Sequence, residues 1–328
     1  MSTTTTPPIR PSLHAIGALV GRHTIIVAYA VMALLFIVTE ILLPGFDTPG
    51  HLSLILSQAA ILGIVAAGQT VVVLTGGIDL SVGAMMSLAG VTLTGVSNGT
   101  NSGFAAALAV ALVLGIAVGL INGLGIALLR VPPLVMTLGM SGILTGVTLV
   151  STNGTPSGSA PPASVTLATG TLFNVPIAIL VWAAVTLALV VLLRLTVFGR
   201  QLYALGNSPR VSILSGVNPL IITLAIYALS GAGAAFAGIL LTGQNGNANT
   251  SAGDVFLLPS VAAVVVGGTS ILGGRGGYGG TVAGAIIITV LQAFLQAKGI
   301  AQPGQDILYG ILILVMLFLY GREVARRS

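Results

Sequence analysis

The sequence predicts an all-α integral membrane protein, and its composition is the main reason. Of the 328 residues, 55% are hydrophobic and only 5% are charged, whereas soluble domains carry about 25% charged residues. The mean hydropathy is +1.10. The 45 glycines are roughly twice the average share, which suits membrane helices that pack closely through small residues. With no cysteine and three scattered histidines, disulfides and iron–sulfur clusters are excluded and no metal site is expected.

Apolar segments of bilayer length recur along the chain. The first, residues 24–43, is too long for a signal-peptide core, so we expect a retained helix after a cytoplasmic tail of residues 1–23. Nine more segments lie at about 52–75, 82–97, 104–129, 134–151, 174–195, 218–242, 257–272, 280–297 and 306–320. They predict a membrane domain over residues 24–320 with about ten crossings and a cytoplasmic tail of residues 321–328.

The basic residues support this topology. If the N-terminus is cytoplasmic and the chain crosses ten times, ten of the 11 lysines and arginines lie inside and Lys298 alone lies outside, as the positive-inside rule requires. The ten are Arg10, Arg22, Arg130, Arg194, Arg200, Arg210, Arg275, Arg322, Arg326 and Arg327. Both termini are therefore expected in the cytoplasm, and the net charge of +5 reflects topology and not nucleic-acid binding.

The sequence leaves the path of two short segments undecided and predicts little structure in the outer loops. Segments 82–97 and 257–272 are near the short limit for a span, so full crossings and broken or re-entrant helices are both possible there. The outer loops, 97–103, 152–171 and 242–254, are rich in small polar residues, which predicts turns without a separate domain.

Residues 69–83 join two apolar segments and contain the most unusual acid of the chain. Gly76 and Gly77 precede Asp79, the only one of the six acidic residues with long apolar runs on both sides. A carboxylate close to hydrocarbon is costly, which indicates a function. Asp79 is equally suited to cap the next helix through a backbone N–H two or three residues on, and the two roles are compatible. Polar residues predicted along a translocation path are Gln69, Thr70, Thr75, Asp79, Ser81, Asn122 and Thr137.

The longest predicted cytoplasmic connection covers residues 198–217. Ser208 and Pro209 form an N-cap and first-turn pair and Gly216 a stop, which predicts a short helix over 209–215. A short helix on the membrane face is suited to a groove on a soluble partner, and an ordinary interfacial turn is the alternative.

A second glycine-rich junction, 264–280, resembles a phosphate-binding loop only superficially. The Walker pattern requires a lysine followed by serine or threonine, and the single lysine, Lys298, is followed by Gly299. We therefore expect no ATPase site, no enzyme activity and no cofactor on this chain. Close helix packing is the favoured role of these glycines.

Four blocks, in order, resemble the membrane permeases of bacterial sugar-type ABC importers, the ribose, arabinose, xylose and galactofuranose group. The blocks are residues 68–83, 133–139, 203–216 and 262–276. The resemblance spans about residues 50–320. It implies an inner-membrane subunit that forms the translocation path for a small neutral carbohydrate or sugar-like solute.

The resemblance also implies partners. These are a second permease, identical or different, two ATP-binding subunits or one fused double ATPase that binds ATP and Mg²⁺, a periplasmic or lipid-anchored substrate-binding protein, and membrane lipid. The residues that would dock the ATPase are Gly206, Asn207, Ser208, Pro209, Arg210, Leu214, Ser215 and Gly216.

Residues 208–211, Ser-Pro-Arg-Val, depart from the acidic or small residues and paired alanines typical of that block. They are similar to the corresponding residues in one of the two permeases of an autoinducer-2 importer. This favours a heterodimeric system and weakens an assignment to ribose.

Other function classes fit the residues less well. An ion-coupled secondary transporter of a small polar solute is the alternative function, but it needs ionisable groups along its path, and only Asp79 and Glu40 qualify. An intramembrane hydrolase needs a nucleophile with a base, and no histidine or lysine lies well inside a span. A channel without energy coupling leaves the 198–217 connection unexplained.

Overall fold

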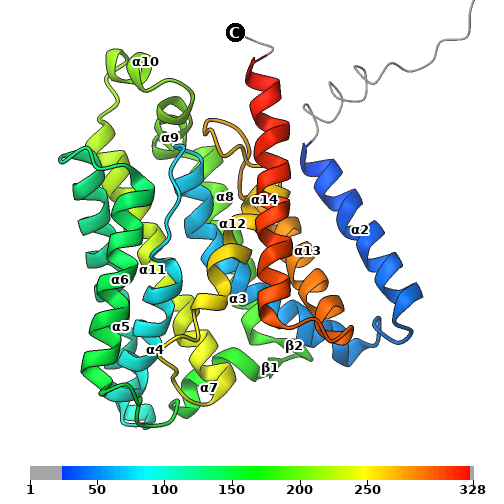
Figure 1. Cartoon of the computed structure of the whole chain (residues 1–328). Coiled ribbons are helices and arrows are strands. Elements are labelled where there is room, and N and C mark those ends of the chain that lie inside the picture. The colour runs from blue at the N-terminus through cyan, green and yellow to red at the C-terminus, as the bar shows by residue number, and fades with distance from the viewer. Residues whose placement is uncertain (1–23, 326–328) are drawn as a thin grey trace, which may run out of the picture.

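The computed structural model describes residues 24–325, so the predicted tail of residues 1–23 lies outside the described part of the chain. This part is a bundle of helices with one very small hairpin (Figure 1). The elements are α2 (Thr24–Leu42), α3 (Pro49–Val73), α4 (Val82–Ser97), α5 (Asn101–Ala127), α6 (Pro133–Thr152), α7 (Pro162–Thr169), β1 (Thr171–Leu172), β2 (Val175–Pro176), α8 (Ile177–Leu195), α9 (Val197–Asn207), α10 (Pro209–Leu214), α11 (Pro219–Asn245), the 3₁₀ turn η1 (Asp254–Phe256), α12 (Leu257–Val266), α13 (Tyr278–Ala297) and α14 (Gln302–Ala325).

Within residues 24–325, seven helices are long and apolar enough to cross a membrane: α2, α3, α5, α6, α8, α11 and α13. Three shorter apolar stretches lie in α4, in η1 with α12, and in α14. Eight of the ten predicted segments coincide with helices to within three residues at both ends. The chain is therefore a multi-pass, nearly all-α membrane protein.

Helix α3 lies at the centre of the bundle. It is apolar all round, as expected of a helix that neighbours enclose on every side, and it packs against α8, α11, α12 and α13. Two hydrogen bonds in series join α8, α13 and α3. Trp182 Nε1 donates to the Tyr278 hydroxyl (2.8 Å), which donates to the Gly63 carbonyl (2.7 Å). The Trp182 ring occupies the place where a side chain at position 63 would lie.

Helices α5 and α11 approach each other most closely through glycine. A Cβ at Gly115 would overlap the Gly231 carbonyl, and one at Gly119 would overlap the Tyr227 carbonyl. Lipid supplies no hydrophobic force between helices, so this close backbone contact is the source of their association. The high glycine content of the sequence thus has the packing role predicted for it.

The prediction of turns for the outer loop 152–171 is wrong for residues 162–169, which form α7. Pro162 stands in the first turn of this helix, where proline is tolerated. The Ser164 carbonyl and Ala168 pack where Gly243 of α11 has no side chain. Tertiary packing against α11 therefore favours a helix where local composition favours a loop. The hairpin β1–β2 follows directly.

The segment predicted at 257–272 is helical only as far as Val266. The ten residues of α12 extend about 15 Å, half of the ~30 Å hydrocarbon core. Residues 267–277 then form an irregular, glycine-rich turn before α13 begins. The short helix predicted over 209–215 is confirmed as α10, whereas α9 was not predicted.

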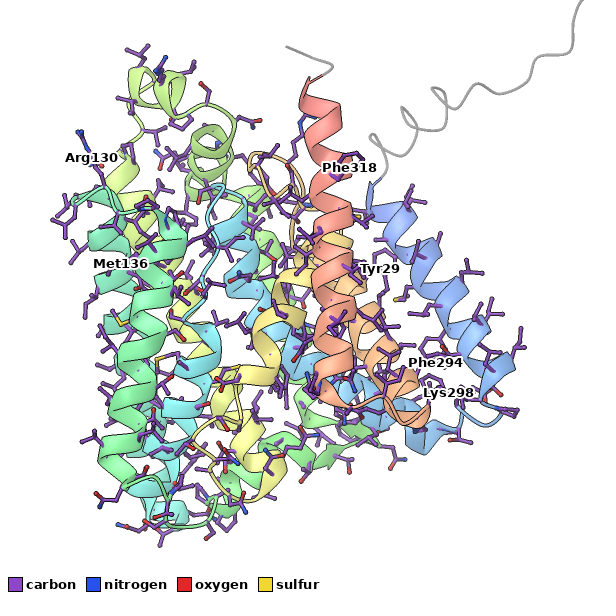
Figure 2. The ribbon with its side chains drawn as sticks, viewed as in Figure 1. Tyr29, Arg130, Met136, Phe294, Lys298 and Phe318 are labelled. Carbon is purple, nitrogen blue, oxygen red and sulfur yellow. The ribbon has the colours of Figure 1, made fainter. Side chains whose placement is uncertain are left out.

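The two ends of the bundle carry different elements. Helices α9 and α10 and the end of α14 lie at one end, and α7 with the β1–β2 hairpin lies at the other (Figure 1). Arg130 lies at the α10 end and Lys298 toward the opposite one (Figure 2). This arrangement agrees with the sides predicted for both residues.

Thiol labelling tests the orientation directly, because the chain contains no cysteine. Ser102 in the first turn of α5, Ser157 in the α6–α7 connection and Ser215 in the α10–α11 connection are exposed, and the first two lie at the end of the bundle opposite to Ser215. We expect a membrane-impermeant reagent to label Ser102→Cys and Ser157→Cys in intact cells, and to label Ser215→Cys only after the membrane is opened. Labelling of Ser215→Cys in intact cells would invert the predicted topology.

Candidate functional site

The connection between α3 and α4 holds a buried polar cluster centred on Asp79. Ser81 donates to Asp79 Oδ1 through both its hydroxyl (2.6 Å) and its backbone N–H (3.0 Å), and the Ser230 hydroxyl donates to Oδ2 (2.7 Å). Asp79 is 1% exposed. Both carboxylate oxygens are satisfied by hydrogen bonds from neutral groups, and this offsets part of the cost of burying a charge.

Two further side chains secure this connection from neighbouring helices. Asn122 Nδ2 of α5 donates to the Ser81 hydroxyl (3.0 Å). The Thr137 hydroxyl of α6 accepts from the Leu80 N–H (3.0 Å) and lies 2.9 Å from the Pro133 carbonyl, to which it can donate. The cluster therefore joins the α3–α4 connection to α5, α6 and α11.

The predicted hydrogen bond from Asp79 to a nearby backbone N–H is confirmed, but the prediction that Asp79 caps α4 is wrong. The carboxylate does accept from an N–H two residues on, that of Ser81. The residue at the N-cap of α4 is Ser81 itself, whose side chain makes no capping bond. Asp79 instead closes a turn just before the helix, a common use of aspartate.

The structure separates the other predicted path residues from this cluster. The Thr70 hydroxyl lies 2.9 Å from the Thr281 hydroxyl and so ties α3 to α13, while the Thr75 hydroxyl donates to the Val72 carbonyl at the end of α3. Gln69 is fully buried, and its amide atoms have no hydrogen-bond partner among the described residues. Of the seven predicted residues, Asp79, Ser81, Asn122 and Thr137 form one site.

Sequence reasoning missed two members of this neighbourhood, both on α11. Ser230 donates to Asp79, and the buried Tyr227 hydroxyl lies where a side chain at Gly77 would be. The available signal was Ser230 itself, a polar residue inside a long apolar segment, where polar groups usually face protein.

Helices α9 and α10 have an inner and an outer surface. On the inner surface a Cβ at Gly206 would overlap the Leu74 carbonyl and lie 2.7 Å from the Gly274 nitrogen. Asn207 Nδ2 donates to the Gly274 carbonyl (3.1 Å) and the Tyr203 carbonyl (2.9 Å). Gly206 and Asn207, predicted to dock a partner, thus contact the backbone of their own chain.

The outer surface is exposed and partly apolar. Leu214 is 88% exposed and Val211 61% exposed, and Pro209, Arg210, Ser215 and Gly216 are exposed beside them. Exposed apolar side chains on so short a helix make few contacts within the chain. Leu214 and its exposed neighbours Pro209, Arg210, Ser215 and Gly216 are the part of the predicted docking set that is free to contact another molecule, and Val211, which was not predicted, adds to this surface.

Three segments meet beneath α9. The Gly274 N–H donates to the Leu74 carbonyl at the end of α3 (2.8 Å), and the Tyr203 hydroxyl of α9 donates to the Gly276 carbonyl (2.9 Å). Burial raises the pKa of Tyr203, and the charge of Arg194 opposes this rise, so the hydroxyl keeps its proton at physiological pH. Gly274 and Gly276 both have positive φ, which favours glycine.

Residues 51–317 match the family described as the branched-chain amino acid transport system permease component. The chain belongs to this permease family. Its match covers most of the chain, including α3 to α13 and the α9–α10 connection. As a permease component, it is a transport subunit and not an enzyme.

Several curated proteins are similar to this permease over nearly its whole length. The ribose import permease RbsC of Bacillus subtilis is 37% identical over 295 residues, covering 89% of the chain and 91% of the relative. The fructose import permease FrcC of Rhizobium meliloti is 37% identical over 296 residues (87% and 82%). The autoinducer 2 import permease LsrD of Photorhabdus laumondii is 34% identical over 309 residues (90% and 91%). No solved structure matches the permease.

The Asp79 cluster predicts a graded response to substitution. Asp79→Ala leaves the Ser81 and Ser230 hydroxyls without their acceptor, whereas Asp79→Asn keeps one oxygen for Ser81. Each lost bond to a charged group costs about 1.5–3 kcal/mol, so Asp79→Ala should lower the aggregation midpoint in detergent by on the order of 5–10 °C. Asp79→Asn should lower it less.

Asp47→Ala is the control, because this side chain is exposed. It should leave the midpoint unchanged. A wild-type midpoint for Asp79→Ala would show that the cluster does not stabilise the fold.

Gly206 predicts a different effect. Gly206→Ala places a methyl group against the Leu74 carbonyl, so it should separate α9 from the end of α3 and lower both stability and uptake. Gly216→Ala is a control at a glycine with open space and positive φ, where only backbone strain is added. Equal aggregation midpoints for the two variants, measured in detergent, would contradict the packing role of Gly206.

Proposed function

We propose that this permease is the membrane subunit of an ABC importer and forms the path for a small neutral carbohydrate or sugar-like solute. The observation that carries the proposal is the similarity, over about nine-tenths of the chain, to permeases named for import of ribose, fructose and autoinducer 2. The sequence lacks a Walker motif, so energy must come from ATP-binding partners, which hold ATP and Mg²⁺.

The remaining parts of the assembly follow from the same proposal. They are a second permease, identical or different, two ATP-binding subunits or one fused double ATPase, and a periplasmic or lipid-anchored binding protein. The setting is the bacterial inner membrane, with ten crossings and both termini in the cytoplasm. The sides of Arg130 and Lys298 support this orientation (Figure 2). Exposed apolar side chains on α2, α5, α6 and α14 offer surface for lipid or for the second permease.

Coupling is proposed to occur through α10. Its exposed residues, Leu214 above all, would insert into a groove on the ATPase. Movement of α10 and α9 would reach the membrane through the contact of Gly206 with the Leu74 carbonyl and Gly274. Packed backbones cannot be compressed, so the α3–α4 connection and the 267–277 turn would move with α9.

The Asp79 cluster would act as the second part of this linkage. It holds the α3–α4 connection to α5, α6 and α11 through one side chain from each helix, Asn122, Thr137 and Ser230. Displacement of this connection would shift these helices together and not singly. The residues of the cluster are therefore proposed as positioning residues beside the path.

The ion-coupled alternative has less support. Its two candidate carboxylates already have partners: Asp79 accepts from Ser81 and Ser230. Glu40 accepts from the backbone N–H groups of Gly45 (3.0 Å) and Asp47 (2.9 Å), which stabilises the turn after α2. Uptake into proteoliposomes that persists without ATP and follows a proton or sodium gradient would favour this alternative.

Leu214 provides the test of docking. Leu214→Asp places a charge on the exposed apolar surface of α10, so the ATPase should no longer co-purify and ATP-driven uptake should fall at least tenfold. Permease expression and its aggregation midpoint should stay as in the wild type, since Leu214 is 88% exposed.

Leu129→Asp is the matched control. Leu129 is 76% exposed and lies in the α5–α6 connection beside Arg130, and this variant should retain the ATPase. Co-purification and coupled uptake with Leu214→Asp would contradict the docking role of α10.

A further inference from the structure

A cavity lined by carboxamides lies at the end of the bundle opposite α10. Its volume is about 450 Å³, within the range of about 300–1,000 Å³ for small-molecule sites. It is lined by residues of the first half and middle of α3, of the second half of α13 and of the end of α11, together with the connection after α11, η1 and Pro259 of α12. Helices α3, α11 and α13 have their other ends near α9 or α10.

The polar lining is unusual because it consists mainly of neutral amides. Gln58, Gln244, Gln292 and Gln296 line the cavity with three asparagines of the 245–249 segment. On α13, Thr289, Gln292 and Gln296 follow helical spacing and so share one face. Within the described residues, the side-chain amides of these four glutamines make no hydrogen bond, so their donors and acceptors are free for a ligand.

The lining also defines what the cavity excludes. None of the lining residues is charged, and Leu62, Leu241 and Pro259 supply apolar surface. A zwitterionic amino acid would lose the hydration of its ammonium and carboxylate groups there without gaining a charged partner. A polyhydroxylated neutral solute would pair its hydroxyls with amides, each of which offers both donors and an acceptor.

We propose that this cavity binds a neutral polyhydroxylated solute of the sugar class on its way into the translocation path. This inference rests on the proposed function and deepens it. It selects a sugar over the amino acid suggested by the family's description. It also assigns contact residues, Gln58, Gln244, Gln292 and Gln296, that are separate from the Asp79 cluster.

A single cysteine tests the site by direct occupancy. In the complete importer, Gln296→Cys should react with an impermeant thiol reagent added outside. Saturating D-ribose or D-fructose, whichever the importer takes up, should slow this reaction about three- to tenfold, and L-leucine should not. Ser102→Cys, exposed at the same end but outside the cavity, is the control whose labelling the sugar should not slow.

Uptake kinetics provide the second measurement. Gln292→Met keeps the approximate size but loses the amide, so the concentration for half-maximal uptake should rise about three- to tenfold, the effect of one lost hydrogen bond. ATP hydrolysis stimulated by the binding protein should persist. Gln302→Met is the matched control, because Gln302 lies on α14, donates to Asp306 (2.9 Å) and does not line the cavity.

The outcomes separate this inference from the proposed function. ATP-driven sugar uptake that is unchanged in Gln292→Met, with no protection of Gln296→Cys, would overturn the site and leave the ABC importer proposal standing. Uptake of leucine and of neither sugar by the wild-type importer would overturn the sugar class in this inference and in the proposed function. Sugar uptake without ATP, with protection of Gln296→Cys, would overturn ATP coupling and leave the site standing.

Discussion

The hydrogen bond from the Gly274 N–H to the Leu74 carbonyl joins the two places where helices stop inside this fold. Hydrocarbon provides no water for unpaired backbone groups, so irregular backbone is tolerated only where protein or a polar cavity surrounds it. Here the end of α3 and the turn after α12 satisfy each other. Gly206 of α9 lies against both, and the absence of a side chain there is what allows the contact.

This arrangement connects the exposed α10 to the buried interior through the backbone contact at Gly206 and through the side-chain hydrogen bonds of Tyr203 and Asn207. Side-chain contacts can change rotamer and absorb a displacement, whereas abutting backbones transmit it. The Asp79 cluster begins a few residues beyond Leu74 and is itself held from α5, α6 and α11. The polar network and the glycine contact are thus consecutive along the chain.

Sequence predicted the spans well because their signal is local. Apolar length defines α3 or α11 without knowledge of their neighbours, and Ser208, Pro209 and Gly216 define α10 in the same way. The failures concern partners in space. Helix α7 depends on α11, Ser230 is one hydroxyl in an apolar helix, and the resemblance of block 203–216 does not show that Gly206 faces inward. The amides of the cavity come from separate segments, so no single stretch of sequence brings them together.

Helix α2 has a consequence for biosynthesis. It packs mainly against α13, and Tyr29 donates to the Gly279 carbonyl across 250 positions of sequence (Figure 2). At about 5–20 residues per second, the ribosome needs roughly 12–50 s to supply that partner. Until then, the contacts of α2 are those of Leu35 and Phe36 with Phe46 and Ile55 in the segment that follows it. The nearly unbroken apolar surface of α2, more than any contact in the finished bundle, is what this waiting period requires.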